Sequence, residues 1–191
     1  MFEELEKVRE KCLKCTKCDL HKTRNNIVFG DGVVGSKIML IGEAPGFNED
    51  MQGVPFVGRA GKLLDDILGS VGLSRKENVY ICNTVKCRPP ENRNPEQVEK
   101  NACREYLDKQ IEILKPKIIL ICGAVALNSM MGLNGGITKV RGKWFDGPNG
   151  SKMMPIFHPS YLLRNPSHKE GSPKWLMWQD IKEVRRYFDS L

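Results

Sequence analysis

Residues 37–46 read KIMLIGEAPG, an apolar run of strand length that ends at Gly42 and passes into a turn. A short apolar run bounded by turn residues is typical of a strand buried on both faces of a sheet. Three more segments have this character, at residues 79–82, 117–122 and 153–157. The sequence therefore predicts four buried strands.

Between and around these strands, apolar residues recur at helical spacing. The predicted helices cover residues 3–13, 60–71, 95–111, 123–132 and 173–188. In the last helix we expect five residues to face the core: Trp175, Trp178, Ile181, Val184 and Phe188. The turn-rich residues 88–94 are predicted to lack regular structure. Strands interleaved with helices predict an α/β fold, a three-layer sandwich around a mostly parallel four-stranded sheet. No repeat or linker interrupts the chain, so we expect residues 1–191 to form a single domain.

The composition is that of a basic globular protein. The 191 residues carry 30 Lys and Arg against 23 Asp and Glu, a net charge of +7, and 40% are hydrophobic. No apolar run approaches the roughly 20 residues that a bilayer span needs, so we expect no membrane association. The first residues lack the basic and apolar regions of a secretory signal, which predicts a cytoplasmic protein. The positive charge favours a polyanionic partner.

The seven cysteines predict a metal site. Their number is odd and no export signal accompanies them, which argues against a disulfide framework. Cys82 and Cys122 end apolar strands and are predicted to be core residues, whereas the other five lie in polar surroundings. The CxxC at residues 15–18 could share a zinc ion or an iron–sulfur cluster with Cys87 and Cys103. Cys12 is a fifth cysteine beside a site for four ligands, and spacing does not decide whether Cys12 or Cys15 is the spare that binds no metal.

Polar residues follow three of the four predicted strands. Glu43, Asn83 and His158 come at or just after strand ends, and ligands of open α/β sheets bind at that edge. Each residue alone has an ordinary explanation, such as a histidine that caps a loop, but their conjunction predicts a site. Residues 55–61, PFVGRAG, place an aromatic ring in a glycine-rich loop before a helix. This loop could hold a planar ring or leave helix amides free for phosphate. No Walker P-loop is present, because Leu63 follows Gly61 and Lys62.

In this order the motifs resemble those of the family-four uracil-DNA glycosylases, which carry an iron–sulfur cluster. The resemblance covers nearly the whole chain. It rests on Cys15 and Cys18, GEAPG at 42–46, PFVGRAG at 55–61, ICN at 81–83, KCRPP at 86–90 with Cys103, ITKVRG at 137–142 and HPSYLLR at 158–164.

The resemblance implies hydrolysis of the N-glycosidic bond of deoxyuridine in DNA, which releases uracil. It implies a [4Fe–4S] cluster on Cys15, Cys18, Cys87 and Cys103, with Cys12 as the spare. It places six residues around a flipped-out uracil: Gly42, Glu43, Ala44, Phe56, Asn83 and His158. It also implies a DNA-contacting loop of Tyr161, Leu162, Leu163 and Arg164.

The chemistry of these residues suits the implied reaction. His158 would donate to uracil O2, Phe56 would stack on the base, and the Asn83 amide would donate to O4 and accept from N3–H. Glycosylases of the best-known branch have an aspartate where this chain has Ala44. Handling of the attacking water therefore falls to Glu43 or Glu49.

The implied partner is uracil-containing DNA, single- or double-stranded, and a sliding clamp is a further candidate partner. We expect a monomer that works in the cytoplasm of a prokaryote. Three other readings stay open. One is a non-catalytic iron–sulfur DNA-binding or polymerase-accessory protein of the same fold. Another is a related glycosylase trapped covalently on its product, although that branch has a histidine-containing loop and residues 84–103 contain no histidine. The last is a zinc-stapled nucleotide-binding enzyme.

Overall fold

The computed structural model describes residues 1–191 and is built on one sheet with strand order β1-β3-β2-β4-β6-β5. Its four central strands are β3 (Val79–Asn83), β2 (Ile38–Gly42), β4 (Ile118–Cys122) and β6 (Lys152–Ile156). All four are parallel. The predicted α/β class and the four predicted strands are confirmed.

The sheet has six strands, however, so the expectation of four was incomplete. The two-residue strand β1 (Asp31–Gly32) pairs antiparallel with β3, and β5 (Phe145–Asp146) pairs antiparallel with β6. Two residues are too few to show a periodic pattern, and β1 contains no apolar residue. These edge strands are specified by their neighbours rather than by their own sequence.

Five of the helices match the predicted ones: α1 (Phe2–Leu13), α3 (Arg59–Gly69), α4 (Gln97–Leu114), α5 (Ala124–Met131) and α8 (Pro173–Asp189). Helix α4 begins after Pro95, because Glu96 is its N-cap and forms a capping box with Glu99. Three short helices were not predicted: α2 (Phe47–Gln52), α6 (Ile137–Val140) and α7 (Pro159–Arg164). Three 3₁₀ turns complete the structure, at Asp19–Lys22, Pro90–Asn92 and Pro148–Gly150. The second of them interrupts residues 88–94, which were predicted to be wholly irregular.

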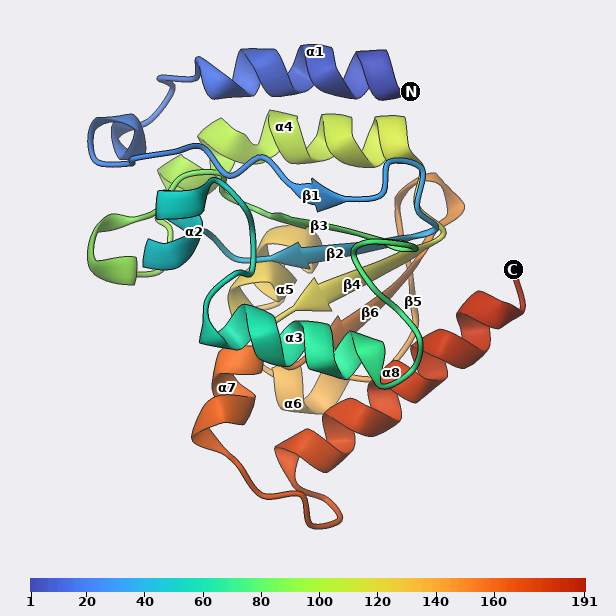
Figure 1. Ribbon diagram of the computed structural model, residues 1–191. Helices are drawn as coiled ribbons and strands as arrows, with labels where there is room; N and C mark the ends of the chain where they lie inside the picture. The colour runs from blue at the N-terminus through green and yellow to red at the C-terminus, as the bar shows by residue number, and fades with distance from the viewer.

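Helices cover both faces of the sheet, which gives the predicted three layers (Figure 1). Alternate strand residues point to opposite faces. Met39, Tyr80 and Ile119 pack with α1, α4 and α5, whereas Leu40 and Ile81 pack with α3, α7 and α8. Cys82 and Cys122 are fully buried, as predicted.

One core prediction is wrong. Trp178 is 47% exposed, and the ammonium of Lys182 lies over its ring at 3.6 Å. The predicted Ile181 and Val184 are buried, and Met177 takes the inward position next to Trp178, at the helical spacing of three to four residues. Trp178 lies about 100° around the helix from Met177 and so points to solvent.

The register of the sheet brings the polar strand ends together. Gly42 at the end of β2 is paired with Asn83 at the end of β3. His158 follows the parallel strand β6 and caps α7. The arrowheads of the central strands point towards the edge where α2 and α7 lie (Figure 1).

Candidate active site

A cavity of about 590 Å³ opens at the carboxyl edge of the sheet. Among the predicted residues, those that line it are Glu43, Ala44, Glu49, Phe56, Asn83, His158 and Arg164. They come from four different segments of the chain, and the sheet brings them to one place. Gly42 lies beside the cavity, where a Cβ atom would meet the Phe56 ring at 2.6 Å and also the Asn83 side chain. Glycine is therefore required at this position for the Phe56 ring and the Asn83 side chain to lie so close to β2.

Asn83 has a polar group without a partner. Its side chain is 2% exposed, and its Oδ1 is buried with no hydrogen bond. A buried polar atom of this kind costs about 1–3 kcal/mol. A ligand that donates a hydrogen bond to this oxygen would recover that energy, so Asn83 is poised to read a polar edge.

His158 is held as a neutral hydrogen-bond donor. The Ser160 N–H donates to Nδ1 of His158 at 3.1 Å, and the Ser160 hydroxyl lies 2.8 Å from the same nitrogen. Because Nδ1 accepts, a neutral ring carries its proton on Nε2. Burial, reinforced by the positive charge of Arg164, lowers the pKa of His158 to about 4. The ring therefore presents an uncharged N–H donor at neutral pH.

Phe56 is fixed in a conformation that a bulky residue rarely adopts. Its φ is +53°, and its ring centroid lies 5.6 Å from that of His158. Arg75 secures the loop, since its guanidinium donates to the main-chain oxygens of Pro55 at 2.7 Å and Phe56 at 2.8 Å. Strain of this kind persists only where surrounding contacts hold it, and it is concentrated at functional sites.

The two candidate carboxylates differ in their contacts. Oε1 of Glu49 accepts from the N–H groups of Val57 and Gly58, both at 2.9 Å. These two amides lie just before α3, whose N-cap is Gly58, and Glu49 occupies both of them. Glu43 has no such anchor. Burial raises its pKa, and the charge of Lys100 opposes that rise.

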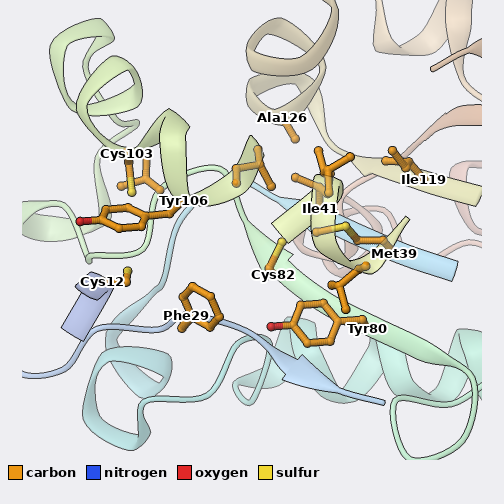
Figure 2. Close-up of a cluster of buried hydrophobic side chains, with 14 of the residues drawn as sticks. Cys12, Phe29, Met39, Ile41, Tyr80, Cys82, Cys103, Tyr106, Ile119 and Ala126 are labelled. Carbon is orange, nitrogen blue, oxygen red and sulfur yellow. The ribbon is translucent and has the colours of Figure 1, made fainter. Parts of the chain in front are cut away.

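The five remaining cysteines line a second, smaller cavity. Cys12, Cys15, Cys18, Cys87 and Cys103 come from α1, the segment after it, the segment after β3, and α4. Three of them are buried, although their sequence neighbours are polar, because Cys12 and Cys103 occupy the inward faces of their helices. Figure 2 shows Cys12 and Cys103 on either side of Tyr106.

The donor set of this cavity suits a group that binds thiolates. Arg24 donates to Sγ of Cys87 at 3.3 Å, and the Lys86 N–H donates to Sγ of Cys103 at 3.2 Å. Burial raises the pKa of Cys12 and of Cys103 to about 12, so these thiols keep their protons unless a cation binds. No three Cys, His, Asp or Glu side chains surround a point that a single ion could occupy. The thiols instead lie around the walls of the cavity.

Comparisons with known proteins agree with this geometry. The Uracil DNA glycosylase superfamily matches residues 29–182. A protein of Thermotoga maritima named type-4 uracil-DNA glycosylase is 47% identical over 186 residues, which is 97% of this chain and 95% of that protein. The chain belongs to the type-4 uracil-DNA glycosylases. Proteins of the same name from Sulfurisphaera tokodaii and Archaeoglobus fulgidus are 43% and 41% identical, over 96% and 88% of this chain and 84% and 88% of theirs.

For this member of the glycosylase family, the predicted DNA-contacting loop is a helix. Residues 161–164 belong to α7, and Leu162 is 0% exposed because it packs in the core below α3 and α8. Leu162 is therefore not available to DNA, which corrects its assignment. Leu163 is 36% exposed and Arg164 is exposed, so these two remain at the surface.

Sequence reasoning missed several residues that line the active-site cavity of this glycosylase. Arg59 and Arg93 add positive charge, and Asn92 and Asn94 add polar groups from the turn-rich segment after Cys87. Ser160 lies within the HPSYLLR motif, but the motif alone did not predict that Ser160 fixes the tautomer of His158 through its hydrogen bonds to Nδ1. Separately, no helix has the length and apolar character needed to cross a membrane.

Proposed function

We propose that the chain is a DNA repair enzyme of base excision, a hydrolase that cleaves the N-glycosidic bond of deoxyuridine and leaves an abasic site. The observation that carries the proposal is the pairing of a neutral His158 donor with an unpartnered Asn83 oxygen in one cavity. Type-4 uracil-DNA glycosylases that are 41–47% identical to the chain support the same activity.

Cleavage of this bond leaves negative charge on uracil and positive charge on the sugar. Nε2–H of His158 would donate to uracil O2 as the charge develops. A donor already fixed in place costs no reorganisation, and one such donor contributes about 10²–10³ in rate. The hydrogen bonds from Ser160 hold the imidazole in the tautomer that can donate. The phosphates of the DNA stabilise the sugar cation.

The target bond lies inside the base stack, so uracil must be extruded into the cavity. The N3–H of uracil would satisfy Oδ1 of Asn83, and the Asn83 NH₂ would donate to O4. Cytosine has an unprotonated N3, which cannot donate to Oδ1 of Asn83. Its N4 amino group cannot accept a hydrogen bond from the Asn83 NH₂. Phe56 would stack on the base, with Gly42, Glu43 and Ala44 around it.

We assign the attacking water to Glu43 rather than to Glu49. One oxygen of the Glu49 carboxylate is already engaged by two main-chain amides, whereas no side-chain hydrogen bond engages the Glu43 carboxylate. Burial raises the pKa of Glu43, which makes its carboxylate a stronger base. Glu49 would instead hold the loop before α3, through the two main-chain amides that it accepts from.

For the cysteine cavity we propose a [4Fe–4S] cluster on Cys15, Cys18, Cys87 and Cys103. The wall-lining arrangement favours a cluster, whose four thiolates bind four separate corners. A zinc ion would instead draw four sulfurs to within about 2.3 Å of one point. When bound, the cluster would cross-link the segment after α1, the segment after β3 and α4, and would play a structural part rather than transfer electrons. Cys12 is the spare thiol.

We propose that residues 1–191 form one glycosylase domain that acts as a monomer on single- or double-stranded uracil-containing DNA. The net charge of +7 provides sequence-independent attraction to phosphate. Leu163 and Arg164 would meet the DNA where the base leaves the stack. The cytoplasm of a prokaryote, beside the chromosome, is the proposed location, and a sliding clamp is a candidate partner.

The direct test is base release from an oligonucleotide with a single uracil, detected by alkaline cleavage of the abasic product. The wild-type chain should convert it, and an identical oligonucleotide with thymine should stay intact. His158→Ala should lower the single-turnover rate by about 10²-fold or more, by analogy with the loss of one oxyanion donor. Binding to DNA without cleavage would instead identify a non-catalytic DNA-binding protein.

A further inference from the structure

A third cavity, of about 240 Å³, lies between the first half of α4 and the end of α5. It is lined by Thr84, Gln97, Lys100, Asn101, Arg104, Leu107, Asn128, Ser129 and Gly132. None of these residues lines the active-site cavity, which we call the uracil cavity, and none lines the cysteine cavity. We call it the α4–α5 cleft.

The chemistry of the α4–α5 cleft is that of an anion site. Lys100 provides a positive charge that no carboxylate pairs with, and Arg104 provides a second that is shared with Asp108 at 2.7 Å; no carboxylate is among the lining residues. The amides of Gln97, Asn101 and Asn128 add neutral donors. Ser129 lines the cleft, and its hydroxyl oxygen is buried without a hydrogen-bond partner.

The cleft adjoins the uracil cavity through a shared wall. Thr84 lines the cleft and Glu43 lines the uracil cavity. The hydroxyl of Thr84 donates to the main-chain oxygen of Glu43 at 2.7 Å, and the N–H of Val85 donates to the same oxygen at 3.1 Å. The charge of Lys100 also acts on the Glu43 carboxyl across this wall. The two cavities are therefore neighbours across this main-chain contact.

The α4 helix itself favours this position. Its N-terminal half carries Lys100 and Arg104 towards the cleft, and that end of α4 lies at the same edge of the sheet as the strand ends (Figure 1). Lys100 contacts Asn128 at 3.3 Å, and Arg104 donates to the main-chain oxygen of Ser129 at 2.8 Å. These bonds join α4 to α5 and hold both cations at the cleft.

We propose that the α4–α5 cleft binds a backbone phosphodiester of the uracil-bearing strand, outside the reacting nucleotide. Its donors match the oxygens of a phosphate, and its volume leaves room for the attached sugar. The inference rests on the proposed function and adds a strand subsite to it. The subsite contributes to affinity and to strand placement and makes no contact with the base.

The test measures kcat/KM for uracil release from single-stranded oligonucleotides lengthened one nucleotide at a time on the 5′ or the 3′ side of uracil. With the wild-type chain, kcat/KM should rise abruptly at the length whose new phosphate reaches the cleft. In Lys100→Gln and in Ser129→Ala this rise should shrink several-fold relative to the shortest substrate of the same variant. For Lys100→Gln, the slope of log affinity against log salt should also fall by about 0.7, the value for one phosphate of a single strand.

Lys109→Gln is the matched control, because Lys109 is an exposed cation on the same helix that does not line the cleft. It should keep the wild-type rise. Ser129→Ala removes no native hydrogen bond, so it separates ligand binding from folding. The proposal is overturned if the wild-type chain shows no rise on either side, or if the cleft variants keep both the rise and the salt slope. Absence of any uracil release would instead overturn the proposed function.

Discussion

The side-chain ammonium of Lys86 donates to the main-chain oxygen of Asn83 at 2.7 Å. Lys86 is 1% exposed, and its second bond runs to Oε1 of Gln110 at 2.5 Å. Its main-chain N–H donates to Sγ of Cys103. One buried residue thus connects Asn83, which lines the active-site cavity, with the cysteine cavity.

Lys86→Met should lower both stability and uracil release. The substitution leaves the Asn83 and Gln110 oxygens without this donor, at about 1–3 kcal/mol for each buried group left unpaired. Loosening of Asn83 should reduce single-turnover uracil release by about 10-fold, on the scale of 1.4 kcal/mol. Thermal denaturation and single-turnover kinetics measure the two effects. Lys109→Met, at an exposed position of α4, should change neither. A lower Tm with unchanged catalysis would limit Lys86 to a role in folding.

Asn83→Asp should change base selection. An ionised carboxylate only accepts hydrogen bonds, so it repels uracil O4 and can accept from the N4 amino group of cytosine. Uracil release should fall by roughly 10²-fold or more, as when a buried polar contact is left unpaired. Slow release of cytosine is expected where the carboxyl is protonated and can donate to N3. Matched oligonucleotides with one uracil or one cytosine provide the measurement.

Asn94→Asp is the control for charge alone, because Asn94 is an exposed residue that lines the same cavity. It should leave the preference for uracil over cytosine unchanged. Uracil release by Asn83→Asp at the parental rate would remove Asn83 from base recognition.

The single-turnover rate should fall at acidic pH (the acidic limb of the profile). It should not fall as the pH rises through about 6.5. The pKa of His158 is lowered to about 4, so the ring is already neutral above that value and loses no proton as the pH rises through about 6.5, the ordinary histidine pKa. The pKa of Glu43 is raised, so its carboxylate becomes protonated as the pH falls and can no longer accept a proton from water. Single-turnover rates across the pH range measure this profile.

Glu43→Gln should remove most of the acidic limb together with most of the rate. Glu49→Gln is the comparison variant, and it should keep the limb. A wild-type rate that falls as the pH rises through about 6.5 would show that a protonated imidazole is needed, contrary to the neutral donor proposed.

Loss of any cluster ligand should release iron. Cys15→Ser, Cys18→Ser, Cys87→Ser and Cys103→Ser should each lower iron content, visible absorbance and soluble yield, because metal binding supplies folding free energy. Cys12→Ser should retain the iron. The opposite pattern for Cys12 and Cys15 would reverse the assignment of ligand and spare. A full complement of zinc with no iron would contradict the cluster itself.

Much of the fold could be predicted because it depends on local patterns. The four apolar runs had the length and composition of buried parallel strands, and the five longer helices had clear periodicity and end signals. The short helix α7 and the edge strands could not be predicted, since pieces of two to six residues carry no readable period. Trp178 was misplaced because Met177 takes the inward position beside it.

The sequence by itself determined that Glu43, Asn83 and His158 would meet at one edge of a parallel sheet, because the order and direction of the strands require it. Only the tertiary structure decided what each group can do there. The neutral state of His158 depends on its burial and on the hydrogen bonds from Ser160. The unpartnered oxygen of Asn83 lies against Gly42, where only a glycine leaves room for it, and the main-chain oxygen of Asn83 is bound by the buried Lys86. Protonation and hydrogen bonding follow from burial and from neighbours in space, and most of these neighbours are far apart along the chain.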